Sequence, residues 1–402
     1  MNNSILKIEN FNHVKTSDII NNSSPFKVKF ISGISLIFLR IKMRLRLLRL
    51  IVTSYYNPID WINALKYLIS LRKNVLGTPK IKKLVQVNDK YYMGIYTPAW
   101  FSRDFNQFIY SHLNDFKPLK KRIQRFNIVF ISVTKKCPLQ CEHCYDWNNI
   151  KGENKKTNIN LFRVIEKIQK LGVGHIQFLG GEPLLEYKKI MEVVKSTKSG
   201  SDFWITTSGF SLSKSKANQL KEAGVSGVII SLDHYNTEKH NKFRNHKDAF
   251  YWVELAVKNA IHAKLIVALS ICITNEFMTN ASLDEYMQTA KSFGVMFVQF
   301  LEPKPVGHYN NKNVLLKEKH IRELEKFFLT YNFTRRYKDY PIIVYPGYHQ
   351  RREGCMMSGK KAIYVDADGH INPCPFCHKS FGKVLDHGLH NKLDMLVAEG
   401  CA

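Results

Sequence analysis

From residue 127 onward, short runs of β-branched and other apolar residues alternate with segments of helical period. Candidate strands are 127–133, 174–179, 203–207, 226–232, 265–273 and 295–301. Apolar spacing predicts helices over 159–171, 185–198, 212–222, 248–262 and 281–292. Because each helix carries the chain back across one face, such alternation builds a parallel sheet. We therefore predict an α/β fold, a partial (β/α)6 TIM-like barrel, with function at the C-terminal strand ends.

The remaining chain divides around this core. Residues 1–125 show no repeat and are predicted to form an N-terminal accessory region. The core is expected over 126–310, followed by a helix near 317–331 within a linking segment, 311–354. Residues 355–402 read as a small cysteine-rich module whose centre, 362–373, is a hairpin with a glycine-containing turn. Within the core, Asn158 is the predicted cap of the first helix and Gly172 its stop.

Composition limits the function classes. An apolar content of 45% in 402 residues excludes a disordered chain. The net charge of +27 predicts attraction to phosphates, anionic lipid or acidic substrates. The basic residues are spread along the chain, whereas a nucleic-acid footprint is clustered, so nucleic-acid binding is not favoured.

Residues 39–47 alternate apolar and basic side chains with a period of two. A strand would place these on two opposite faces, whereas a helix would scatter the charges and leave no clean membrane-binding face. Peripheral association with an anionic membrane through residues 40–49 and a packed accessory segment both stay open. The polar start Met1–Ser4 shows no signal peptide, and the apolar run Phe30–Leu39 is too short to span a bilayer. The eight cysteines are too few for a disulfide scaffold of this size, and their clusters have metal-ligand spacing, which points to a reducing cytoplasm.

Three cysteines, Cys137, Cys141 and Cys144, follow the first strand, with no fourth nearby. A structural zinc ion needs four protein ligands, so zinc here would require a distant residue. Three thiolates on a four-iron cluster leave one iron open, which indicates chemistry.

The second strand ends in Gly180, Gly181, Glu182 and Pro183. Paired glycines let the backbone approach a ligand closely, and proline suits the first turn of the next helix. Alone, such a loop is an ordinary βα turn.

Together, the C-x3-C-x2-C loop and this Gly-Gly-Glu-Pro turn resemble the radical S-adenosylmethionine (radical SAM) superfamily. The resemblance covers about 127–305. It implies that Cys137, Cys141 and Cys144 hold three irons of a 4Fe–4S cluster and that S-adenosylmethionine chelates the fourth. It further implies that Gly180, Gly181 and Glu182 bind the methionine ammonium group.

The later strand ends supply weaker cofactor-binding candidates. These are Ser208 after strand three, Ser231 and Asp233 after strand four, and Arg244 in the segment 239–245 that follows. For each, a capping or solvated polar residue is the structural alternative. Strand six ends at Glu302 and Pro303, facing either cofactor or substrate. His143 stands where many members of the superfamily carry an aromatic residue against the adenine.

The terminal module contains Cys355, Cys374, Cys377 and Cys401. It resembles the twitch form of the SPASM domain, which implies an auxiliary 4Fe–4S cluster. Cys401 is penultimate, so a three-cysteine site, or one completed by His378 or substrate, stays open, as do zinc and no metal. Cys272, within strand five, is expected to be a small core residue.

The resemblance implies an enzyme that cleaves S-adenosylmethionine reductively to a 5′-deoxyadenosyl radical, which abstracts a substrate hydrogen. Expected partners are an electron donor such as a flavodoxin or ferredoxin and, first, a peptide or protein substrate. Oxidation of an alcohol or sugar and RNA modification are alternatives, as is a noncatalytic metal-stabilised binding protein. The ending Gly400-Cys401-Ala402 counts against a molybdopterin-precursor synthase, for which a Gly-Gly end is expected.

Overall fold

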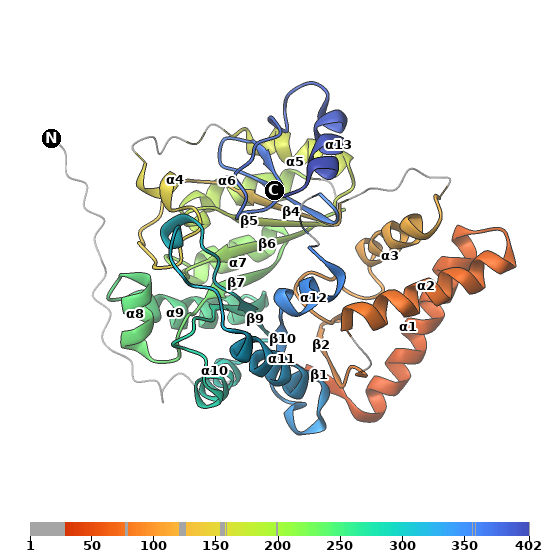
Figure 1. The fold of residues 1–402 in the computed structure, drawn as a ribbon, viewed down its shortest axis with the longest axis horizontal. Helices are drawn as coiled ribbons and strands as arrows, with labels where there is room; N and C mark the ends of the chain where they lie inside the picture. Colours follow the sequence, from red (N-terminus) through yellow and green to blue (C-terminus); the bar gives the residue numbers. More distant parts are fainter. Residues whose placement is uncertain are drawn as a thin grey trace.

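The computed structural model describes residues 29–76, 79–119, 126–152, 157, 159–197, 200–355, 357 and 359–401. Figure 1 shows a large sheet surrounded by helices, a lobe made by the N-terminal helices, and the C-terminal segment lying over β4. Within these ranges, none of the helices is both long and apolar enough to cross a membrane.

A nine-stranded sheet forms the core, in the order β10-β9-β8-β7-β6-β5-β4-β11-β12. Its six central strands are parallel and correspond to the six predicted strands. They span β4 (Ile128–Ser132), β5 (His175–Leu179), β6 (Asp202–Thr207), β7 (Val225–Ser231), β8 (Ile266–Cys272) and β9 (Phe297–Leu301). The predicted α/β fold class is confirmed.

Helices cover one face of this sheet because alternate strand residues pack against them in a single apolar core. They span α5 (Leu161–Lys170), α6 (Tyr187–Ser196), α7 (Lys214–Ala223), α8 (Thr237–Arg244), α9 (Ala249–His262), α10 (Asn280–Ser292) and α11 (Glu318–Phe333). Asn158 lies outside the described residues, and the side chain of Asn160 caps α5 by accepting from Arg163 N. Phe162 lies within the predicted helix 159–171, and its side chain is exposed rather than buried.

Three strands extend the predicted sheet. β10 (Ile342–Val344) pairs with β9, and β11 (Ala362–Val365) lies parallel to β4. The predicted terminal hairpin is present as β11 and β12 (Ile371–Asn372). After α12 (Pro346–Glu353), the C-terminal segment thus enters the core sheet, and it ends with α13 (Leu389–Glu399).

The N-terminal lobe contains β1 (Lys29–Ser32), α1 (Gly33–Ser54), α2 (Pro58–Leu76), β2 (Lys83–Val87), β3 (Lys90–Tyr92) and α3 (Arg103–Phe116). Its three strands form an antiparallel sheet in the order β1-β2-β3. The alternating segment 39–47 lies inside α1, so it is a helix and the strand alternative is wrong. Leu39 and Met43 are buried against the lobe's own core, which stabilises the helical conformation.

Part of the N-terminal lobe packs against the main sheet. Val85, Val87 and Tyr92 share one apolar cluster with Trp204 of β6 and Ile229 of β7. Tyr96, in the segment that follows β3, packs against the same cluster. The lobe therefore covers part of the main sheet.

Candidate functional site

The three-cysteine loop follows β4 directly. Cys141 is buried, whereas Cys137 and Cys144 are half-buried. Cys144 N donates to Cys141 O at 3.3 Å, and Glu142 N donates to Phe243 O at 3.0 Å. The loop is therefore held both by its own turn and by α8.

Arg244, at the end of α8, reaches this loop. Its Nη1 donates to the Cys141 sulfur at 3.5 Å, and its Nε lies 2.5 Å from the Asp233 carboxylate. The second oxygen of Asp233 accepts from Cys272 N at 3.0 Å, and Asp233 N donates to His240 Nδ1 at 3.1 Å. Two predicted site residues, Asp233 and Arg244, thus form one buried unit that contacts a predicted iron ligand.

The two positions directly after β5 require glycine, because the backbone of the cysteine loop passes too close to them for a side chain. A Cβ at Gly181 would lie 2.1 Å from Lys136 O, and one at Gly180, where φ is +140°, would lie 2.6 Å from Thr134 O. Gly181 N and Glu182 N donate to Thr134 O and Lys136 O, each at 2.8 Å. This turn and the loop leading to Cys137 therefore form one interlocked element.

Glu182 is buried and faces the end of β6. One of its oxygens accepts from Leu184 N at 3.0 Å and Thr207 Oγ1 at 2.7 Å. The other accepts from Ser208 N at 2.8 Å and Ser208 Oγ at 2.5 Å. Burial raises the pKa of the Glu182 carboxyl. The four hydrogen bonds favour its charged form and so partly oppose this effect.

The aromatic residues around the third cysteine lie on separate surfaces. The ring of His143 stacks on Phe243 at 4.9 Å, and its Nδ1 is buried and has no hydrogen-bond partner among the described residues. Burial lowers the pKa of His143 to about 4, so the ring is neutral. Tyr145 meets Tyr364 of β11 edge-on at 6.5 Å.

A segment after β9 supports the cysteine loop, and sequence reasoning missed it. At Gly307, where φ is +60°, a Cβ would lie 2.2 Å from Cys144 O. His308 N donates to Cys144 O, and His308 Nδ1 donates to Cys141 O, both at 2.9 Å. Its ring stacks on Trp147 at 3.8 Å. The only sequence signal was the glycine at 307.

The strands of the main sheet also carry hydrogen-bonded polar side chains, and one of these binds a residue from the N-terminal lobe. Gln299 Nε2 donates to Tyr96 OH at 2.6 Å, and Ser270 Oγ donates to Gln299 Oε1 at 3.1 Å. Gln177 Nε2 donates to Thr206 Oγ1 at 2.6 Å. No sequence pattern pointed to Tyr96.

The other strand-end candidates are placed differently. Ser231 is half-buried at the end of β7. Glu302 accepts from Tyr345 OH at 2.5 Å and from Arg351 Nη1 at 2.7 Å, so the segment around α12 engages it. Cys272 is buried in β8, as expected for a core residue.

The C-terminal cysteines come partly together. The sulfurs of Cys374 and Cys401 are 4.0 Å apart. The backbones of Cys374 and Cys377 pair as an isolated antiparallel β-bridge. Burial, with Cys401 beside it, raises the pKa of Cys374 to about 12. Cys355 is half-buried. Phe376, within this turn, meets Tyr145 edge-on at 6.0 Å, which brings the second cysteine group beside the first loop.

The two groups of cysteines suit an iron–sulfur cluster better than a single metal ion. Among the described residues, no three His, Cys, Asp or Glu side chains converge on one point as ligands of one metal ion. A four-iron cluster binds each thiolate through a different iron, so its ligands surround a volume instead. Burial raises the pKa of Cys137 and Cys144 to about 12, which a bound cation would reverse. Soft thiolates on one buried loop, with Arg244 against one of them, therefore fit an iron–sulfur cluster.

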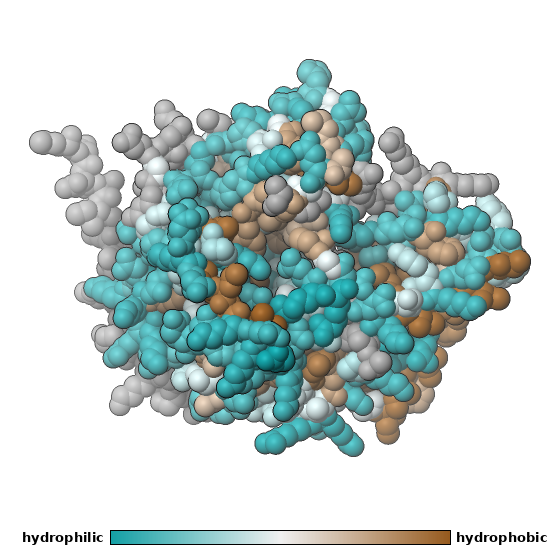
Figure 2. Space-filling model, in the orientation of Figure 1, coloured by the Kyte–Doolittle hydropathy of each residue, from teal (hydrophilic) through white to brown (hydrophobic). Residues whose placement is uncertain are grey.

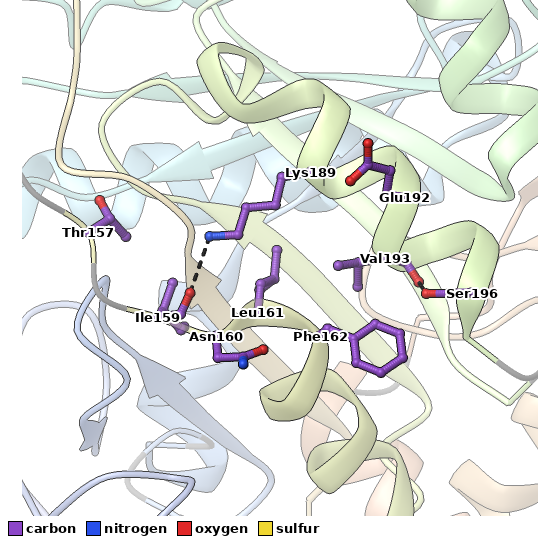
Figure 3. A pocket seen from close by; sticks show the side chains of 9 residues that line it. All are labelled: Thr157, Ile159, Asn160, Leu161, Phe162, Lys189, Glu192, Val193 and Ser196. Carbon is purple, nitrogen blue, oxygen red and sulfur yellow. Dashed lines mark hydrogen bonds between the residues drawn. The ribbon is translucent and has the colours of Figure 1, made fainter.

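A groove of about 540 Å³ lies elsewhere, on the outer helical layer between α5 and α6 (Figure 3). Lys189 Nζ crosses it to donate to Ile159 O at 3.2 Å. Its lining includes Phe162 and Glu192 but none of the predicted site residues. The groove is thus separate from the strand-end site.

A family model described as the radical SAM superfamily matches residues 131–294. A probable GTP 3′,8-cyclase of Methanocaldococcus jannaschii is 29% identical over 262 residues, covering 61% of this chain and 83% of the relative. The GTP 3′,8-cyclase of Aquifex aeolicus is 25% identical over 292 residues, covering 69% and 88%.

Solved structures show the same fold. Streptococcus suis SuiB bound to its precursor peptide SuiA is 14% identical, covers 88% of this chain and 82% of its own, and has a TM-score of 0.57. The structure of anSMEcpe with bound AdoMet is 20% identical, covers 68% and 82%, and has a TM-score of 0.53. The fold, the cysteine loop and the family match thus agree on one type of enzyme.

Proposed function

This chain belongs to the radical SAM superfamily of iron–sulfur enzymes, and from that premise we propose that it abstracts a hydrogen atom from a peptide or protein side chain. The noncatalytic alternative is not retained, because the chain matches the radical SAM family model and its sequence relatives are named as enzymes, GTP 3′,8-cyclases. A reductant and a substrate are therefore required partners.

The chain's own residues divide the work of holding the cofactors. Cys137, Cys141 and Cys144 would hold the cluster, and Arg244 would stabilise the Cys141 thiolate. Glu182, held by Ser208, would accept the methionine ammonium group. When bound, the reduced cluster and S-adenosylmethionine supply a 5′-deoxyadenosyl radical. Residues 307–308 would fix the loop backbone through the hydrogen bonds of His308 to Cys144 O and Cys141 O.

The observation that carries the proposal is the contact between the two cysteine groups. Phe376 meets Tyr145, the residue directly after the third cysteine. Cys374 lies in the turn that contains Phe376, and Cys401 lies just after the end of α13, with the two sulfurs 4.0 Å apart. A substrate held between the two cysteine groups would face the first cysteine loop on one side. On its other side it would face an electron acceptor or a group that binds the substrate. An auxiliary cluster on Cys374, Cys377, Cys401 and Cys355 would supply that second side.

An open sheet edge supports a peptide as substrate. Among the described strands, β1 pairs with β2 alone and so forms an edge of the N-terminal sheet. Extended peptides bind such edges through main-chain hydrogen bonds, which recognise a backbone without demanding one sequence. The same small sheet packs against the main sheet through Val85 and Val87 of β2 and Tyr92 of β3, with Phe30 of β1 beside them.

A purine nucleotide is the second candidate, because the sequence relatives are named GTP 3′,8-cyclases. These relatives weaken the argument that the ending Gly400-Cys401-Ala402 counts against such chemistry. Neither the alcohol or sugar nor the RNA alternative gains a supporting observation from the structure.

The test is anaerobic turnover of the reconstituted full chain with dithionite and S-adenosylmethionine. Formation of 5′-deoxyadenosine that rises with peptides encoded beside the gene, together with a mass change in the peptide, supports the proposal. A rise with GTP and none with peptide would transfer the assignment to the nucleotide. No 5′-deoxyadenosine from a fully loaded cluster would remove the catalytic proposal itself.

The second cluster is tested separately by iron and sulfide analysis of a Cys137→Ala/Cys141→Ala/Cys144→Ala variant. About four irons per chain should remain if the C-terminal cysteines hold a cluster. Adding Cys401→Ser should lower that number, and no iron in the triple variant would refute the auxiliary site.

A further inference from the structure

Helix α1 carries an exposed apolar stripe along its outer side. The stripe consists of Ile34, Phe38, Ile41, Leu45, Leu48 and Val52, spaced alternately four and three residues apart. Ile34 is 74% exposed, Phe38 63% and Leu45 60%. Such spacing keeps all six side chains on one face for about 27 Å of helix.

The opposite side of the same helix is already used. Leu36, Leu39, Met43, Leu50 and Ile51 are buried in the core of the N-terminal lobe. The outer stripe is therefore not part of the lobe's buried core. Two apolar sides with basic borders produce the alternating sequence of 39–47, so our expectation that a helix would have no clean face is wrong.

Helix α2 continues this surface. Ile59, Ile62 and Ile69 are all exposed there, as is Tyr56 between the two helices. In Figure 2, brown atoms collect along the edge of the molecule formed by these helices, while most of the remaining visible surface is teal. An apolar surface of this extent on a folded chain marks an interaction site.

Basic residues border the stripe on both sides. At 100° per residue, Arg44 and Arg40 lie on one border of α1, and Lys42 and Arg49 on the other. Helix α2 adds Lys66, Arg72 and Lys73. Its acidic residue, Asp60, is paired with Lys117 at 2.6 Å and so adds no free negative charge.

We propose that this face of α1 and α2 docks to an anionic lipid surface. An apolar stripe bordered by arginine and lysine matches an interfacial helix, in which apolar side chains enter the acyl boundary and cationic ends reach the headgroups. A second copy of the chain fits less well, because its identical basic borders would face these ones and repel them. The docking is independent of the proposed radical chemistry.

The experiment is vesicle co-sedimentation of the full chain. We expect binding to vesicles of phosphatidylcholine with phosphatidylserine, much weaker binding to phosphatidylcholine alone, and loss of binding as salt is raised. The variant Phe38→Ser/Leu45→Ser should abolish binding, and Arg44→Gln/Arg49→Gln should weaken it by roughly tenfold or more. These side chains are exposed, so the fold should be retained.

Matched variants on other surfaces serve as controls. Leu315→Ser/Met395→Ser removes exposed apolar side chains elsewhere, and Lys319→Gln/Lys326→Gln removes two charges from α11. Both should bind like the unaltered chain. The proposal is overturned if the unaltered chain does not bind anionic vesicles or if Phe38→Ser/Leu45→Ser still binds them. It is also overturned if the unaltered chain is a dimer that binds no vesicles and Phe38→Ser/Leu45→Ser makes it monomeric.

Discussion

Asp233 and Arg244 form a buried ion pair, with 2.5 Å between the carboxylate and the guanidinium Nε, and the same guanidinium contacts the sulfur of Cys141. Burial opposes the charge on Asp233, but Arg244 outweighs it and holds the pKa of the carboxyl below its usual value. One arginine thus links a structural ion pair to a predicted iron ligand.

Removing this arginine should damage both stability and cluster binding. We expect Arg244→Met to lower the free energy of unfolding by about 3–5 kcal/mol, because Asp233 is left buried and unpaired. Asp233→Asn/Arg244→Met should recover part of that stability while iron binding stays low, since Cys141 still lacks its cation. Urea unfolding and iron per chain measure the two effects. The surface variant Lys170→Ala, whose ion pair with Glu166 is exposed, should change neither.

A methyl group at Gly307 should disturb the cysteine loop. Gly307→Ala places a Cβ 2.2 Å from Cys144 O, so the loop or the segment after β9 must move. Gly33 has the same φ of +60°, and no atom of the described residues lies within 4 Å of an added Cβ. Gly33→Ala should therefore show only the backbone strain, about 1–2 kcal/mol. If both variants retain full iron content and S-adenosylmethionine cleavage, residues 307–308 do not support the loop.

Glu182 should tolerate an amide poorly despite its similar shape. All four of its hydrogen-bond partners donate, and a glutamine would aim an NH2 group at one donating pair. We expect Glu182→Gln to cost about 1–3 kcal/mol of unfolding free energy and to weaken S-adenosylmethionine binding in calorimetry. Ser208→Ala removes one donor only and should cost about 1 kcal/mol. Equal effects of the two variants would contradict the role assigned to the carboxylate.

Acid should destabilise the fold through His240. Burial lowers its pKa to about 3, and its Nδ1 must be unprotonated to accept from Asp233 N. The unfolded chain binds this proton near pH 6.5, so the stabilisation is complete above pH 6.5 and is lost as pH falls from there toward 3. The slope is about 1.4 kcal/mol per pH unit for this group.

The corresponding measurement is urea unfolding between pH 5 and pH 7. His240→Asn keeps an acceptor without titrating, so its stability should fall less steeply than that of the unaltered chain. His390→Asn, at an exposed position, should leave the slope unchanged. An unchanged slope in His240→Asn would show that other groups account for the acid sensitivity.

Much of the fold was predictable because it depends on local pattern. The strands at 128–132 and 266–272 are short, buried and rich in β-branched residues, so their positions follow from the local run of apolar residues. The helix 317–331 was similarly predicted to within two residues of α11. The segment 39–47 was harder, because two apolar faces on one helix imitate the period of a strand.

The sequence by itself determined the strand and helix alternation, the spacing of Cys137, Cys141 and Cys144, and the glycines of the turn after β5. Each of these is a relation between residues close along the chain, where backbone geometry limits the choices. Only the tertiary structure decided that Arg244 meets Cys141, that His308 holds the cysteine loop, that Tyr96 meets Gln299 of β9, and that β11 lies beside β4. These contacts join residues far apart in sequence, and their positions depend on how whole elements pack, which no local pattern specifies.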